Sequence, residues 1–106
     1  MLKKVKRRYL ALALDYDGAL DSKEFMATVW NAFLKLYGEY GASRTGLTLI
    51  DYDAEKRFAI IRTVHTAVEM ARTALASISK IGNKPAAVHV LVVSGTLKAL
   101  YKKIQG

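Results

Sequence analysis

Leucines alternate with smaller or more polar residues directly after the first eight residues of the chain. One side of an extended segment would carry Leu10, Leu12 and Leu14, and the other side Tyr9, Ala11 and Ala13. A period of two is typical of a β-strand with one buried face. The pattern therefore predicts a strand over Arg8 to Asp15.

Helical spacing follows this strand. Asp17-Gly18 is typical of a turn, and Asp21 with Glu24 three residues later resembles a capping box that opens a helix. Apolar residues then recur at the spacing of one helix face. These residues are Phe25, Met26, Val29, Trp30, Phe33, Leu34 and Tyr37. We expect the helix to end at Gly38 and a glycine-rich loop to run from Gly38 to Gly46.

Two runs rich in β-branched and aromatic residues predict a hairpin. Leu47 to Tyr52 is the first run, and Lys56 to Val64 is the second, after a tight connection. The second run passes into helical spacing without a Gly or a Pro. We therefore expect a helix from about Thr66 to Ile81, directly after the third strand.

The last quarter of the chain predicts one more strand and one more helix. Gly82-Asn83 ends the preceding helix, and Pro85 begins a strand over residues 86–93. Ser94-Gly95-Thr96 is a suitable start for a final helix with Leu97 and Leu100 on one side.

The expected order is strand, helix, strand, strand, helix, strand, helix. Its first six elements are the split βαβ pattern (βαββαβ) of ferredoxin-like and RNA-recognition-motif-like α+β sandwiches. In that topology the sheet order is fourth, first, third, second, and all neighbours are antiparallel. We expect a single RNA-recognition-motif-like domain over residues 1–106, with an added C-terminal helix and a basic N-terminal segment over residues 1–8.

The composition excludes several classes of protein. The chain of 106 residues is 52% hydrophobic, which suits one compact core. It has no cysteine, so it has no disulfide framework, thiolate metal site or cysteine nucleophile. Its apolar runs are shorter than the roughly 20 residues that span a bilayer. We expect an intracellular, cytoplasmic protein.

The net charge of +8 is unevenly distributed. All nine carboxylates lie between Asp15 and Glu69, whereas residues 1–14 and 71–106 contain only cations among their charged groups. Such segregation creates a directional field that favours a polyanionic partner. The alternative is that the lysines only keep a small protein soluble.

The expected topology sorts these charges to two ends of the sheet. The start of the first strand, the end of the third and the end of the fourth should meet at one end. The cations expected there to meet a polyanion are Lys3, Lys4, Lys6, Arg7, Arg8 and Arg62. The acids Asp15, Asp17, Asp53 and Glu55 should gather at the other end with Lys56 and Arg57. Phosphate contacts predict an affinity that falls steeply with salt.

Local alternatives remain open for several polar residues. Arg62 could instead form an ion pair with a residue such as Glu69. We interpret His65 as a solvated residue at a helix start and His89 as a satisfied structural histidine, so the two do not indicate a metal site. The acids at the turns and Asp51 could hold Mg²⁺, but ion pairs with Lys56 and Arg57 explain them better.

The sheet face and the hydroxyl groups offer little chemistry of their own. Phe58 is the one aromatic of the third strand, so base stacking on the sheet is not expected. The small apolar face beside it could accept the C-terminal helix or a protein partner. Ser43 and Ser94 have no base partner in the sequence pattern. We expect no catalytic residues, no bound cofactor and no metal site in the protein itself.

Three segments together resemble a known family. They are Arg7-Arg-Tyr-Leu-Ala-Leu12, Leu36-Tyr-Gly-Glu-Tyr-Gly-Ala-Ser43, and Ile60-Ile-Arg-Thr-Val64 leading into Ala71-Arg-Thr-Ala-Leu-Ala76. In this combination the chain resembles archaeal ribonuclease P protein component 2, over roughly Arg7 to Ile81.

The resemblance implies a subunit of a ribonucleoprotein endoribonuclease that removes 5′ leaders from precursor tRNA. It implies that the RNA carries out the Mg²⁺-dependent hydrolysis, and that the protein stabilises the RNA's catalytic domain. It also implies a partner, ribonuclease P protein component 3, in a heterotetramer of two copies each. On this interpretation Arg7, Arg8 and Arg62 contact RNA, and the Gly38 to Gly46 loop and the open face form a partner or dimer surface.

Two alternatives come from other classes. A ferredoxin-like regulatory or assembly module would bind a protein or a small ligand through the open face, and its binding would be insensitive to salt. An acylphosphatase-like enzyme would need a phosphate-cradling loop after the first strand. Because Asp15-Tyr-Asp-Gly18 is acidic at that position, the enzyme is the weakest of the three interpretations.

Overall fold

The fold alternates strands and helices in the predicted order, with one extra short strand. The structure is a computed structural model and describes residues 5–105. Its elements are β1 (Arg7–Tyr16), α1 (Ser22–Ser43), β2 (Thr48–Asp53), β3 (Phe58–Val64), the 3₁₀-helix η1 (His65–Ala67), α2 (Val68–Ala76), β4 (Lys80–Ile81), β5 (Lys84–Ser94) and α3 (Leu97–Gln105).

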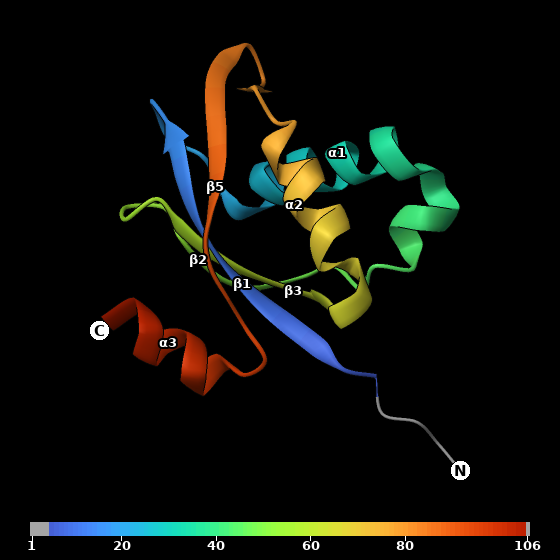
Figure 1. The fold of residues 1–106 in the computed structure, drawn as a ribbon. Helices are drawn as coiled ribbons and strands as arrows, with labels where there is room; N and C mark the ends of the chain where they lie inside the picture. The colour runs from blue at the N-terminus through green and yellow to red at the C-terminus, as the bar shows by residue number, and fades with distance from the viewer. Residues whose placement is uncertain (1–4, 106) are drawn as a thin grey trace.

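The sheet confirms the predicted topology. Its order is β2-β3-β1-β5-β4, and every pair of neighbours is antiparallel. β4 adds two residues to the edge of β5, through the pairs Lys80 with Pro85 and Ile81 with Lys84. α1 and α2 lie on one side of the sheet and α3 on the other (Figure 1).

The main core lies between the sheet and the helices α1 and α2. The leucines of β1 point into this core, as their alternation predicts, and they meet apolar residues from both helices. Fully buried members include Leu10, Leu12, Phe25, Val29, Phe33, Ala59, Ile61, Ala71 and Ala74. Burying a large apolar side chain contributes about 1.5–3 kcal/mol, so this layer supplies most of the stability of the fold.

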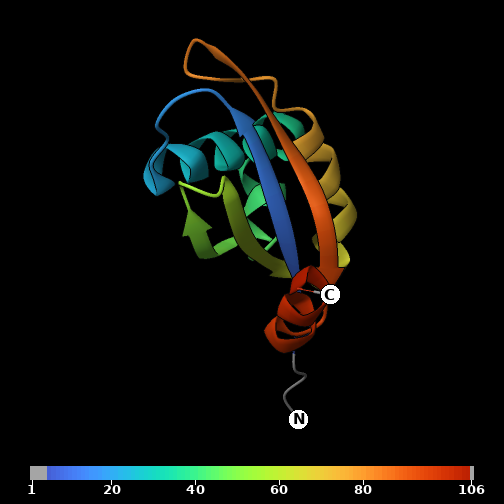
Figure 2. The same ribbon diagram turned by 90° about the vertical axis from the view of Figure 1, so that its left-hand side faces the viewer.

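α3 covers part of the opposite face. Leu100 is fully buried against Ala11 and Ile60, which confirms that the small apolar face accepts the C-terminal helix. The Thr96 hydroxyl caps α3 by accepting a hydrogen bond from the Ala99 N–H at 3.1 Å. In Figure 2 the helix crosses only the end of the sheet where β1 begins and β5 ends. The other half of this face is therefore left without a helix.

Two predicted helix boundaries were wrong. The expected loop from Gly38 to Gly46 is helical as far as Ser43, after a break at Gly38, whose φ of 71° and ψ of 176° suit glycine. Helical structure resumes because Ala42 is fully buried and Thr45 caps it, through a hydroxyl that donates to the Ala42 carbonyl at 2.7 Å.

The second helix is shorter than predicted. α2 ends at Ala76, where the Ser77 hydroxyl bonds back to the Ala74 carbonyl at 2.6 Å. The chain then turns extended, because the Ala86 N–H binds the Ser79 carbonyl at 2.9 Å and β4 pairs with β5. Tertiary pairing therefore overrides the local helical spacing. Over residues 5–105, no helix combines the length and the apolar character needed to cross a membrane.

Candidate nucleic-acid interface

The strand register brings the predicted cations together at one end of the sheet. Arg7 pairs with Val64, Arg8 with Thr63, and Tyr9 lies between Arg62 and Ser94. The Lys6 carbonyl accepts a hydrogen bond from the His65 N–H at 2.8 Å, which joins the N-terminal segment to the end of β3. We call Lys6, Arg7, Arg8 and Arg62 the basic end. Lys3 and Lys4 lie outside the described residues.

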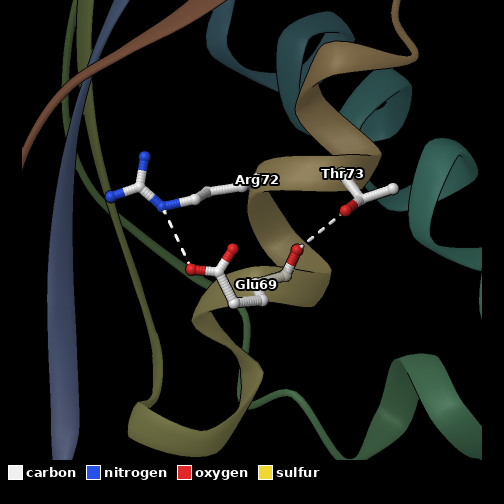
Figure 3. A network of polar contacts seen from close by, with 3 residues as sticks. All are labelled: Glu69, Arg72 and Thr73. Carbon is white, nitrogen blue, oxygen red and sulfur yellow. Dashed lines mark hydrogen bonds and ion pairs between the residues drawn. The ribbon is translucent and has the colours of Figure 1, made fainter.

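Arg62 is half-buried and has an unsatisfied donor. Its Nε is buried and has no hydrogen-bond partner among residues 5–105. The ion pair with Glu69 is not formed: the Glu69 carboxylate instead lies 3.6 Å from Arg72 Nε, one turn along α2 (Figure 3). An unsatisfied buried donor costs about 1–3 kcal/mol, so an anion that binds this guanidinium would recover part of that cost.

Arg8 connects the basic end to the start of α3. Its Nη1 donates to the Arg7 carbonyl at 3.0 Å. A methyl group built at Gly95, in the turn between β5 and α3, would lie 3.6 Å from the same nitrogen. The end of β5 and the beginning of α3 therefore share this end of the sheet, as the topology predicts.

The two histidines differ in their surroundings. His65 is exposed, as predicted, and its Nδ1 lies 3.3 Å from the Lys6 carbonyl. The interpretation of His89 as a satisfied structural histidine was wrong, because the residue is exposed on β5. It pairs with Ala13 on the half of the face that α3 leaves uncovered.

The opposite end of the sheet is held together by its own cations. Arg57 Nη1 donates to the Gly18 carbonyl at 3.0 Å, and Lys84 Nζ donates to the Asp17 carbonyl at 3.2 Å. The expected ion pairs of Lys56 and Arg57 with turn acids are not formed; the Asp53 carboxylate binds the Lys56 backbone N–H at 3.0 Å. Among residues 5–105, no three His, Cys, Asp or Glu side chains gather in an arrangement that could hold a metal ion.

Sequence reasoning missed one cation near the basic end. Arg44 follows α1, and the next residue, Thr45, accepts a hydrogen bond from the Val64 N–H at 2.8 Å. Val64 is the residue that pairs with Arg7. Arg44 was overlooked because the segment around it was expected to be a loop. The helix break at Gly38 and the cap at Thr45, which bring Arg44 to this position, leave little trace in the periodicity.

Almost the whole chain matches the model of one protein family. The model of the Rpp14/Pop5 family matches residues 8–105. The chain belongs to the Rpp14/Pop5 family. Arg8, Arg44 and Arg62 lie inside the matched region, whereas Lys6 and Arg7 precede it.

Archaeal members of the Rpp14/Pop5 family are similar along most of the chain. Ribonuclease P protein component 2 of Pyrococcus horikoshii is 33% identical over 98 residues, which are 92% of this chain and 82% of that protein. The component 2 proteins of Methanococcus maripaludis and Methanosarcina barkeri are 32% and 30% identical, over 92% and 94% of this chain and 74% and 73% of theirs. The resemblance seen in the three sequence segments is thereby confirmed.

The fold also occurs in a solved ribonucleoprotein. A chain in the cryo-EM structure of yeast ribonuclease MRP superimposes with a TM-score of 0.72, covering 99% of this chain and 92% of that chain. The sequence identity is 17%, so this likeness shows that the two chains share a fold.

Proposed function

We propose that this chain, a subunit of the ribonuclease P ribonucleoprotein by family membership, uses its basic end to bind the phosphate backbone of the ribonuclease P RNA. The arrangement of Lys6, Arg7, Arg8 and Arg62 carries the proposal. These four cations lie at one end of the sheet, and none has a carboxylate within 4 Å among residues 5–105. Lys3 and Lys4, which precede them in the sequence, would extend this contact.

The role of such a contact is electrostatic. Folding an RNA brings phosphates together, and a cationic surface lowers their repulsion while releasing condensed counterions. The protein would thereby stabilise the catalytic domain of the RNA for removal of 5′ leaders from precursor tRNA. In this scheme the RNA performs the hydrolysis with its own Mg²⁺, and the protein supplies no catalytic group.

A protein partner fits a second surface. Leu91 on β5 is 54% exposed, and Tyr101 and Ile104 on α3 are 39% and 38% exposed. Exposed apolar side chains on neighbouring elements are typical of protein contacts. This surface would bind ribonuclease P protein component 3 in a heterotetramer of two copies each. The substitutions Leu91→Lys and Ile104→Lys together should abolish co-elution with component 3, whereas Leu36→Lys on α1 should not.

Filter binding to the ribonuclease P RNA over a series of salt concentrations tests the phosphate contact. The variant Arg7→Ala, Arg8→Ala, Arg62→Ala loses three phosphate contacts. Because each contact contributes about 0.7 to 0.9 to the salt slope, the slope should fall by about 2 to 3 and the affinity at 0.1 M salt by about 100-fold.

A charge-matched control separates location from net charge. The triple variant Lys23→Ala, Lys35→Ala, Lys56→Ala removes three exposed cations elsewhere on the molecule and should change the affinity by about twofold at most. Equal losses in the two variants would show that only net charge matters. An unchanged slope in the arginine variant would contradict the proposal.

A further inference from the structure

In this chain α3 covers the part of the sheet on which RNA-recognition-motif-like domains stack bases. RNA-recognition-motif-like domains bind single strands on aromatic side chains of their central strands. In this chain α3 lies over that position: Ala11, Ile60 and Leu100 are fully buried together, and Phe58 packs against them. If unpaired bases of the bound RNA stack on an aromatic side chain, this side chain must lie elsewhere on the molecule.

Tyr40 is the most exposed aromatic residue of the chain. It is 74% exposed, compared with 39% for Tyr101 and 37% for Trp30. At this exposure at least one face of the ring must be open to solvent. Exposing an aromatic ring has no benefit for folding, since burial of its apolar surface would be favourable. The exposure of Tyr40 therefore leaves its ring available to another molecule.

Arg44 holds the Tyr40 ring in place. Arg44 Nη1 donates to the Tyr40 hydroxyl at 2.6 Å, and its guanidinium carbon lies 5.2 Å from the ring centroid. Tyr40 lies on the part of α1 that follows Gly38, and Arg44, four residues later, is the residue that caps the end of this helix. A ring that is already oriented loses less conformational entropy when a ligand stacks on it.

The pair lies at the same end of the sheet as the proposed phosphate contact. The backbone link from Thr45 to Val64 connects Arg44 to the strand end that pairs with Arg7. Figure 1 shows the last turn of α1, the end of β3 and the start of β1 on the same side of the molecule. Among the described residues, Arg44 has no carboxylate within 4 Å.

We infer that Tyr40, oriented by Arg44, stacks on an unpaired nucleobase of an RNA whose phosphates occupy the basic end. This inference rests on the proposed function. A stacking ring next to a cation that follows the backbone is the usual arrangement for binding single-stranded nucleic acid. The alternative occupant is a protein, as the family resemblance implies for the segment from Gly38 to Gly46. A tyrosine beside an arginine is common at protein interfaces as well. RNA is favoured here because Arg7, Arg8 and Arg62 lie at the same end of the sheet, and a concentration of cations attracts a polyanion.

Two RNA probes of equal sequence test the inference with the full chain. One is a 12-nucleotide single strand with a central 2-aminopurine, and the other is the same strand in a 12-base-pair duplex. Binding of the single strand should quench the 2-aminopurine fluorescence. Tyr40→Ala should abolish the quenching and weaken single-strand binding about tenfold, while duplex binding stays within about twofold.

Conservative variants separate stacking from apolar contact. Tyr40→Phe keeps the ring and should bind the single strand within about threefold of the unsubstituted chain, whereas Tyr40→Leu keeps only an apolar surface and should behave like Tyr40→Ala. Leu36→Ala, at a 46% exposed position on the same helix, is the matched control and should leave both affinities unchanged. Far-UV circular dichroism and thermal unfolding check that each variant folds.

Each other outcome overturns a specific statement. If Tyr40→Ala binds the single strand as tightly as the unsubstituted chain, the nucleobase contact is wrong and the segment serves a protein. Equal losses for single strand and duplex also contradict stacking. If the arginine variant of the basic end loses RNA affinity while Tyr40→Ala does not, the proposed function stands without this inference. If the unsubstituted chain does not bind the ribonuclease P RNA in a salt-dependent way, the proposed function itself fails.

Discussion

The two ends of the sheet contain similar residues but use them differently. At the end near Asp15 and Asp17, the side chains of Arg57 and Lys84 bind backbone carbonyls of the turn between β1 and α1. At the basic end, counting partners within residues 5–105, Arg62 has a buried Nε without a partner and the guanidinium of Arg8 reaches only the carbonyl of its neighbour. The first set of cations maintains the fold, and the second remains available to a ligand.

This difference shows that net charge alone does not identify a polyanion site. A cation whose hydrogen bonds are satisfied within the protein must break them to bind a phosphate, whereas an unsatisfied one gains a partner. The basic end therefore combines a favourable field with donors that are not yet used. Substitutions that exchange the properties of the two ends test this comparison directly.

A charge reversal should show the largest difference between the ends. Arg7→Glu and Lys56→Glu both change an exposed residue and lower the net charge by two. Arg7→Glu removes a phosphate contact and adds repulsion, so RNA affinity at 0.1 M salt should fall at least about tenfold. Lys56→Glu should lower it by about twofold. Filter binding at matched ionic strength provides the measurement, and comparable losses would mean that the ends are equivalent.

Replacing an arginine by methionine should change the free energy of unfolding in opposite directions at the two ends. Arg62→Met keeps the aliphatic stem and removes the unsatisfied Nε, so the free energy of unfolding should rise by about 1 kcal/mol while RNA affinity falls. Arg57→Met removes the hydrogen bond to the Gly18 carbonyl, so the free energy of unfolding should fall by about 1–2 kcal/mol. Urea unfolding monitored by circular dichroism measures both.

The sign of the Arg62 effect decides what this residue does. A destabilised Arg62→Met would show that the arginine supports the fold, and its place in the RNA site would then lack its main argument. Arg62→Lys serves as a control for charge, because it retains the cation but loses the planar guanidinium. It should bind RNA more tightly than Arg62→Met.

Much of the fold could be predicted from periodicity and turn residues. The alternation of β1, the stripe of α1 and the strand order follow from hydrophobic patterns, because one face of each element has to be buried. The errors lie where tertiary contacts override local preference. β4 forms from a segment with helical spacing because β5 offers backbone partners, and α1 resumes after Gly38 because Ala42 is buried.

The candidate site could be predicted only in part. The topology places Arg7, Arg8 and Arg62 at one end, and the register confirms this placement. Which cations are satisfied depends on side-chain geometry, which no periodicity encodes. For that reason the pairing of Arg57 with turn acids was wrong, and the pair formed by Tyr40 and Arg44 was missed.

Substitution of Lys84 should have a smaller effect than the charge reversals and the arginine substitutions above. Its ammonium group binds the Asp17 carbonyl at 3.2 Å and lies 5.9 Å from the centre of the Tyr16 ring, which ties β5 to the turn after β1. Because this contact is exposed to solvent, Lys84→Met should lower the free energy of unfolding by about 0.5 kcal/mol. At 1 M salt the difference should shrink, since the Debye length falls to about 3 Å. Arg8→Met is the counterpart at the basic end, where the Arg8 side chain donates to the preceding carbonyl, and it should leave the stability nearly unchanged. A larger loss for Arg8→Met than for Lys84→Met would show that the basic end also maintains the fold, and the division between the two ends would no longer hold.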